Sequence, residues 1–254
     1  MEIKIPVYII HTLVNWYGKQ LYYLRWGSVI SSTFHVTNGV RQGGILFPML
    51  FHIYIDKLNH ILGHCNVGLH LPPNGLFLNN FSFADDMSLI SPSVAGLRKL
   101  LKICEHNALE NDIIYNTQKS VCMVFQPTSF KLPSPPSTYV DNYMYLGHIL
   151  KSNQSDNEDM MRHYRYLCTR TNMLLRKFKP CLLSIKIRLF KSYCCTMYCV
   201  PLWTNFSENV KRKLVIGYNN SLHFLLCLPR WNSAYNMFVN YNVFSFKDVM
   251  RKYV

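Results

Sequence analysis

The stretch Phe81-Ser-Phe-Ala-Asp-Asp-Met-Ser-Leu-Ile-Ser91 places two adjacent carboxylates, Asp85 and Asp86, between two short apolar runs. The flanking runs have the composition of buried strands, so a strand–turn–strand would present the pair past the end of a sheet. Two interpretations are open, a solvated turn and a metal site. Two divalent ions about 3.5–4 Å apart can activate an attacking oxygen and stabilise a leaving one, and Mg²⁺ prefers carboxylate ligands.

The composition indicates a globular chain with a substantial core. Of its 254 residues, 49% are apolar and only 16% are charged, which argues against disorder. The longest apolar run, "ILFPMLFHIYI" from Ile45, has 11 residues, short of the roughly 18–20 that a membrane helix needs. Residues 1–6 do not resemble a signal peptide. We therefore expect an intracellular protein without a membrane partner, with nucleus or cytoplasm left open.

Nine cysteines, an odd number without CxxC pairs, indicate reduced thiols rather than a disulfide framework. Cys195 and Cys199 are four residues apart in a predicted helix, as are His60 and His64 in another. Either pair could begin a zinc site, but a structural zinc needs further ligands at a matching spacing, and none is visible. Buried cysteines in the core are the favoured interpretation.

Positive charge is concentrated in the second part of the chain. Residues 151–254 hold 17 Lys and Arg against 5 Asp and Glu, which is +12 of the total net charge of +14. Plain solubility rarely requires such an asymmetry. It predicts that a polyanion, most simply a nucleic acid, lies along the second part.

The hydrophobic pattern predicts mixed α and β structure followed by helices. A proline-rich segment at 126–138 separates two kinds of pattern. Before it we expect helices at 7–20, from the Gly43 loop to about Leu62, and at 91–109. The last of these would have Ser91 as N-cap and Pro92 at the first helical position. We also expect strand pairs at 21–39 (turning near Gly27) and 68–90, and one or two strands at 113–125. After it we expect a strand–turn–strand at 143–150 and basic helices at 157–178 (capped by Ser155), 184–199, 207–227 and 244–253.

Four blocks, taken in order, resemble successive motifs of the reverse transcriptases of non-LTR (LINE-like) retrotransposons. They are "NGVRQGGILFPMLFHIYIDKL", "FADDMSLISPSVAGL", "IIYNTQKS" and "YLGHIL". The resemblance implies an α+β fold: a partial right-hand polymerase palm at 1–150, with an antiparallel sheet and helices, followed by an all-α, thumb-like domain at 151–254. It also implies RNA-directed DNA polymerase chemistry with two Mg²⁺ ions, an RNA template, a DNA primer and deoxynucleoside triphosphates.

The first two blocks imply a set of catalytic and loop residues. Asp85 and Asp86 match the metal-binding pair of the family. Gln42 and Gly43, followed by Gly44, match the loop that lies against template–primer and incoming nucleotide. Glycine suits that place, because backbone approaches a nucleic acid closely only where no side chain intervenes. Arg41 either contacts phosphate or is an exposed loop arginine.

The last two blocks imply contacts to nucleotide and primer. Asn116 and Lys119 match an "N-x-x-K" pattern in which the lysine lies near the nucleotide phosphates; a lysine at a strand edge is the alternative. Tyr145, Leu146 and Gly147 match the turn that grips the primer end.

Departures from the family pattern predict an N-terminally truncated, catalytically incomplete polymerase. The family's third metal aspartate, at the end of an upstream strand, has no counterpart here, and neither has its upstream fingers region. Phe83 replaces a tyrosine, and Phe47 replaces a serine. The alternatives are a non-catalytic nucleic-acid-binding remnant, in which Trp203 and Trp231 could stack on bases, and a decayed element without a selected function.

Overall fold

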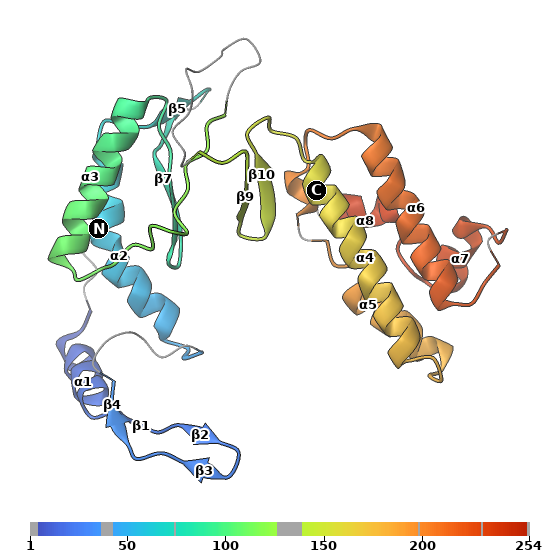
Figure 1. The fold of residues 1–254 in the computed structure, drawn as a ribbon, viewed down its shortest axis with the longest axis horizontal. Helices are drawn as coiled ribbons and strands as arrows, with labels where there is room; N and C mark the ends of the chain where they lie inside the picture. Colours follow the sequence, from blue (N-terminus) through green and yellow to red (C-terminus); the bar gives the residue numbers. More distant parts are fainter. Residues whose placement is uncertain are drawn as a thin grey trace. The chain divides into compact units, whose positions relative to one another are not determined.

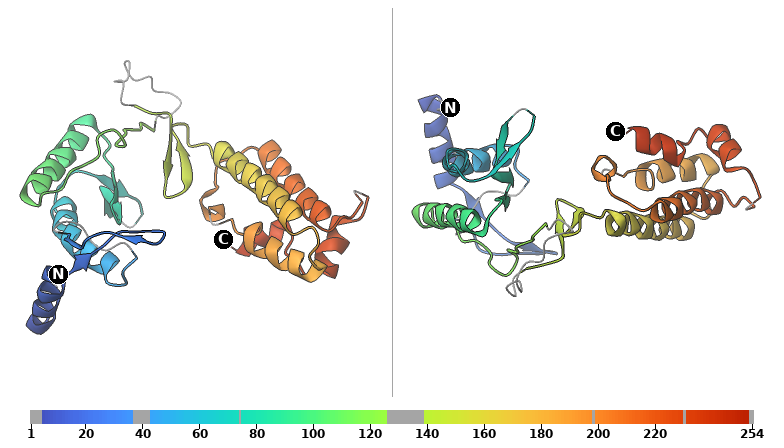
Figure 2. Two further views of the ribbon diagram at one scale, coloured as in Figure 1. Left: turned by 60° about the horizontal axis from the view of Figure 1, so that its bottom comes forward. Right: turned by 90° about the horizontal axis from the view of Figure 1, so that it is seen from above.

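The computed structural model describes residues 5–36, 43–73, 75–125, 139–197, 199–229 and 231–252 (Figures 1 and 2). The chain divides into two compact units between Tyr115 and Asn116, and each is described by itself below. Helices and two-stranded antiparallel sheets make up the described residues, so the predicted α+β class is confirmed. The predicted domain boundary at residue 151 rests on charge and motif order and stays a prediction.

The N-terminal elements expose most of their apolar side chains. Helix α1 (Val7–Gly18) buries none of its residues. Strand β1 (Leu21–Tyr22) pairs with β4 (Phe34–His35), and β2 (Arg25–Trp26) pairs with β3 (Val29–Ile30). The β2–β3 turn contains Gly27 at φ 60°, where glycine carries no steric penalty. The predicted helix and hairpin are both confirmed.

The rest of the first unit packs two helices against two hairpins. Helix α2 (Phe47–Gly63) and helix α3 (Val94–Glu110) lie beside β5 (Leu69–Leu71), β6 (Leu76–Leu78), β7 (Asn80–Phe83) and β8 (Asp86–Leu89) (Figure 1). The buried residues that share this small core are Leu58, Leu62, Leu100 and Cys104. A salt bridge of 3.0 Å between Lys57 and Glu110 also joins α2 to α3.

Two local predictions for the first 125 residues are wrong. The N-cap of α3 is Ser93, whose hydroxyl accepts a hydrogen bond from the Gly96 amide, rather than Ser91. The Ser91 hydroxyl instead accepts from the Ser93 amide at 3.3 Å. Residues 113–125 form no regular strand; within the described residues the segment makes an isolated bridge between Cys122 and Tyr139.

The second unit is a hairpin followed by a helical core. The hairpin of β9 (Asn142–Tyr145) and β10 (His148–Lys151) precedes α4 (Asn157–Lys177), α5 (Leu183–Tyr193), the 3₁₀ turn η1 (Val200–Leu202), α6 (Glu208–Leu225), α7 (Ala234–Asn240) and α8 (Phe246–Lys252). Helices α4 and α6 run side by side (Figures 1 and 2). Gly217 permits this approach, because a Cβ there would lie 2.4 Å from the Tyr164 ring.

Tyr218 occupies the centre of this helical core. Its ring is fully buried and lies 5.6 Å from that of Phe190, 5.9 Å from that of Phe238 and 5.8 Å from that of Phe246. The hydroxyl donates to the Phe244 carbonyl at 2.8 Å, so the one polar atom of this aromatic cluster is satisfied.

Several helix ends in the second unit differ from the prediction. Helix α5 ends at Tyr193 instead of 199, because the amides of Cys194 and Cys195 both turn back to the Phe190 carbonyl. The expected shared helical face of Cys195 and Cys199 is therefore wrong. Helix α7 was not predicted. At α4 the N-cap position is Asp156, not Ser155, and its side chain makes no capping bond within the helix.

None of the described helices combines the length and the apolar character required to cross a bilayer.

Candidate functional site

Asp85 and Asp86 occupy the tip of the β7–β8 hairpin. The register pairs Phe83 with Asp86, so Ala84 and Asp85 form a two-residue turn. Ala84 has a φ of 51°, in a region that costs an L-residue about 1–2 kcal/mol. The strand–turn–strand predicted from the sequence is confirmed, with Asp85 in the turn and Asp86 at the start of β8, and both residues are exposed.

The hairpin is held to α2 by asparagine side chains. Asn59 of α2 accepts from the Asn80 amide group at 3.1 Å and from the Ser82 hydroxyl at 3.0 Å. Asn79 is buried and donates to the carbonyls of Leu62 and Val67 at 2.6 and 3.0 Å. Leaving a buried polar side chain without its hydrogen bonds costs free energy, so these hydrogen bonds hold the hairpin against α2.

The two faces of the hairpin differ in exposure. Met87 and Leu89 pack against the small core of the first unit, whereas Phe81 and Phe83 are 49% and 64% exposed. The alternation is that of a strand with one buried face. The aspartate tip thus projects from an anchored hairpin whose other face is open.

The donor set at the tip suits a hard cation. Two adjacent carboxylates offer oxygen ligands only, as Mg²⁺ prefers, and Mg²⁺ commonly takes its remaining ligands from water and substrate phosphates. Within the described residues, no third His, Cys, Asp or Glu joins Asp85 and Asp86 in a group able to hold a metal. The pair therefore fits a metal only as a partial site.

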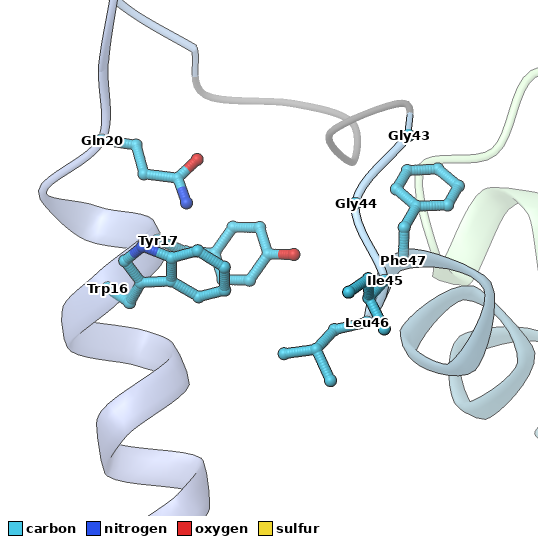
Figure 3. Close-up of a pocket in the computed structure, with 8 residues that line it drawn as sticks. All are labelled: Trp16, Tyr17, Gln20, Gly43, Gly44, Ile45, Leu46 and Phe47. Atoms are coloured by element: carbon cyan, nitrogen blue, oxygen red, sulfur yellow. The ribbon is translucent and has the colours of Figure 1, made fainter.

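The glycine-rich loop is described from Gly43 onward, and Arg41 and Gln42 lie outside the described residues. Gly43 has a φ of 83°, and a Cβ there would meet open space. Gly43 and Gly44 line an open hollow of about 360 Å³ between the end of α1 and the start of α2 (Figure 3). The hollow is bordered by Trp16, Tyr17, Gln20, Ile45, Leu46 and Phe47. The bulky Phe47 ring thus stands beside the loop.

Asn116 and Lys119 form a turn in the second unit. The Lys119 amide donates to the Asn116 side chain at 3.1 Å and to its carbonyl at 3.2 Å. Such a bond from the backbone to an asparagine side chain stabilises a turn. The lysine side chain is exposed, and because Lys119 lies in a turn, the alternative of a lysine at a strand edge is wrong. Its role beside a nucleotide stays a prediction.

Tyr145, Leu146 and Gly147 form the turn of the β9–β10 hairpin. The register pairs Tyr145 with His148, and the two turn residues have φ values of 47° and 80°. Positive φ at both central positions is a type I′ turn, which favours Asn-Gly. Leu146 is 45% exposed, so the turn retains an unfavourable leucine at a solvent-facing position.

Replacing Leu146 by asparagine is expected to raise the free energy of unfolding by about 1 kcal/mol, because asparagine tolerates this conformation. The measurement is urea unfolding monitored by circular dichroism. Leu146→Ala is the control and should show no such gain, since alanine keeps the strain. Equal midpoints for the two variants would contradict the assignment of strain to this turn.

A buried cluster in the second unit is the one group in the described residues that could hold a metal by distance. Ligand atoms of His148, Asp159 and Cys199 lie within 4.8 Å of one another. Its nitrogen and sulfur donors suit zinc better than Mg²⁺. However, the Asp159 carboxylate already accepts from Arg162 and Trp203, and the guanidinium would face a bound cation.

Hydrogen bonds determine the charge state of Asp159. Burial alone would raise its pKa, but hydrogen bonds from Trp203, Arg162 and the Ile149 amide together hold the pKa below its ordinary value. The carboxylate is therefore ionised at neutral pH inside the protein.

Basic and aromatic side chains share one edge of α4. The guanidinium carbons of Arg162 and Arg170 lie 5.6 and 5.9 Å from the centre of the Tyr166 ring, and that ring is 47% exposed. Arg162 is largely buried and paired with Asp159, so this edge presents the exposed Tyr166 ring and the half-buried Arg170 to solvent. Trp203 is buried, so the expectation that it stacks on bases is wrong, whereas Trp231 is 85% exposed.

Sequence reasoning missed the residues that hold both hairpins in place. Asn59, Asn79 and Asp159 belong to none of the sequence motifs. Trp203, the partner of Asp159, is 44 residues away in the sequence. The available signal was the hairpin segment "YLGHIL", in which His148 opens the second strand, followed by an acidic segment.

Comparison with known proteins gives one match. The family described as "Reverse transcriptase (RNA-dependent DNA polymerase)" matches residues 2–150. That range is more than half of the chain and contains both hairpin tips and the glycine-rich loop. No curated protein matches the chain.

Proposed function

We propose a role in template-directed DNA synthesis for this chain, which belongs to the reverse transcriptase (RNA-dependent DNA polymerase) family. The observation that carries the proposal is the anchored β7–β8 hairpin, with Asp85 and Asp86 exposed at its tip inside the matched range. Motif order supports a non-LTR, LINE-like member, with a palm at 1–150 and a thumb-like domain at 151–254.

The chemistry proposed for the hairpin is nucleotidyl transfer. Divalent ions, when bound, would neutralise charge that develops on the transferring phosphate. Asp85 and Asp86 hold oxygen ligands at a fixed place, because the hairpin below them is bonded to Asn59. Gly43 and Gly44 leave space for a backbone or nucleotide to approach. Lys119 supplies an exposed positive charge suited to phosphate.

We also propose that catalysis by these 254 residues alone is incomplete. Support comes from the described residues, which bring no third carboxylate to Asp85 and Asp86. The test is to read the transcript upstream of the codon for Met1. An in-frame segment ending in a strand with a terminal aspartate would complete the site. A stop codon close upstream would overturn polymerase activity and leave binding as the function.

Nucleic-acid binding without catalysis is the second candidate. The favouring observation is the set of exposed basic side chains in the helical unit, which complements the Arg162–Tyr166–Arg170 edge of α4. Among the described residues of these helices and their connections, the exposed Lys and Arg are Arg165, Arg176, Lys177, Lys179, Arg188, Arg212, Lys213, Lys247, Arg251 and Lys252. Contacts to phosphates would make binding sequence-tolerant and salt-dependent.

Replacing Arg212 and Lys213 together by glutamine is expected to make the salt dependence of RNA–DNA hybrid binding shallower. Each lost phosphate contact reduces the slope of log K against log salt by about 1. Fluorescence anisotropy at several salt concentrations measures this slope. The matched control replaces Lys99 and Lys102 of α3 by glutamine. This double substitution removes the same charge and should leave the slope unchanged. Equal slopes for both double variants would contradict binding along α6.

A further inference from the structure

Asp159 is a buried charge that joins several segments of the second unit. Its side chain is fully buried, and it lies in the first turn of α4. One carboxylate oxygen accepts from the Ile149 amide of β10 at 3.1 Å and from Arg162 Nε at 3.0 Å. The other accepts from Trp203 Nε1 at 2.8 Å. A buried charge persists only where it is fully paired, as it is here.

Arg162 extends this contact to the turn of the β9–β10 hairpin. Its Nη2 donates to the Gly147 carbonyl as well as to the Asp159 carboxylate. The side chain is only 13% exposed. The fork of a guanidinium can hold two acceptors in a fixed relation, which a lysine cannot. The turn is thus tied to α4 through one side chain.

A second carboxylate reinforces the same connection. Asp156 accepts from the amides of Thr204 and Asn205, both at 2.8 Å. His148 lies between the two acids, with Nε2 3.5 Å from Asp156 and Nδ1 3.1 Å from Asp159. The hairpin, the start of α4 and the segment after η1 are therefore joined by one polar network.

We propose that Asp159 and Arg162 are positioning residues that set the conformation of the Leu146–Gly147 turn relative to α4. The turn is the segment assigned to the primer end, so the consequence for primer binding rests on the proposed function. Arg162 holds the turn from the side of α4, and Cys199 Sγ makes a longer bond of 3.6 Å to the same Gly147 carbonyl. With these bonds in place, the turn and the Arg162–Tyr166–Arg170 edge move as one body, which suits a primer terminus whose backbone follows the basic edge.

The test uses the full chain with Arg162→Lys and Asp159→Asn, and Glu158→Gln as control. Glu158 is in the same helical turn and forms a half-exposed ion pair with Lys151, at the end of β10 that lies away from the Leu146–Gly147 turn. The first readout is the amide signal and ¹⁵N relaxation of Leu146 and Gly147. The second is anisotropy with an RNA–DNA hybrid carrying a recessed primer 3′ end against the same hybrid with blunt ends.

Wild type and Glu158→Gln should prefer the recessed end by about tenfold, or 1.4 kcal/mol. Arg162→Lys should mobilise Gly147 and remove the preference while leaving the salt slope unchanged, a pattern that general loss of stability does not produce. Unchanged Gly147 signals in folded Arg162→Lys would overturn the positioning role. If wild type shows no end preference but the variant mobilises Gly147, positioning is supported and the proposed primer contact is wrong. Because Arg162→Lys keeps a positive charge beside Asp159, it tests the positioning role even if Asp159→Asn does not fold.

Discussion

Asp159→Ala is expected to destabilise the helical unit by about 3–5 kcal/mol, the cost of removing one partner of a buried ion pair. Arg162 would keep its charge in a site that is only 13% exposed. The indole of Trp203 and the amide of Ile149 would lose their acceptor as well. Chemical denaturation of the full chain, followed by the near-ultraviolet signal, measures the loss.

The control for this loss is Glu158→Ala, which removes a neighbouring carboxylate from a surface pair and should cost no more than about 1 kcal/mol. The pH dependence gives a second check. Because the folded pKa of Asp159 is depressed, its contribution is present above the unfolded pKa, about 4, and is lost as pH falls through the folded value. Asp159→Asn should lack this acid loss. An equally steep acid loss in Asp159→Asn would contradict the role given to the carboxylate.

Asp86→Asn is expected to lower template-directed nucleotide incorporation about a thousandfold in a polymerase completed by an upstream third carboxylate. A metal ligand contributes several kcal/mol to the transition state, and each 1.36 kcal/mol is a factor of ten. Extension of an oligo(dT) primer on poly(rA) with labelled dTTP measures the rate.

Asp112→Asn is the matched control for this loss of activity. Asp112 is exposed and has a φ of 50°, a conformation that asparagine also tolerates. The substitution removes the same charge at a turn without a proposed metal and should leave incorporation within about twofold of wild type, a difference well below 1 kcal/mol. Equal losses in the two variants would contradict the assignment of Asp86.

Local patterns predicted the elements that carry the aspartates. The strand-like composition of the runs that flank Asp85 and Asp86 predicted the hairpin, and the hydrophobic pattern predicted α2 and α3. Patterns failed where a distant group decides the outcome. The end of α5 at Tyr193 follows from a capping geometry that no Gly or Pro signals. Among the described residues, 113–125 makes one isolated bridge instead of the strand that its composition predicts.

Only those residues of the candidate site that lie within sequence motifs were predicted. Asp85, Asp86 and the Tyr145–Gly147 turn were found from short patterns with known local geometry. Asn59 contacts its hairpin 21 residues away along the chain, and Asp159 contacts β10 across 10 residues and Trp203 across 44. Such contacts depend on whether a polar side chain is buried, and the sequence around that residue does not show this.

The most direct test of the central claim is Mn²⁺-induced broadening of backbone amide signals, which reports a bound divalent ion without requiring catalysis. Mn²⁺ is predicted to broaden the amides of Ala84, Asp85, Asp86 and Met87 selectively, more strongly when a deoxynucleoside triphosphate is added. The double variant Asp85→Asn, Asp86→Asn should abolish this broadening, and Asp112→Asn should leave it intact. Broadening that is absent from the hairpin, or unchanged in the double variant, would contradict a metal and nucleotide site at its tip.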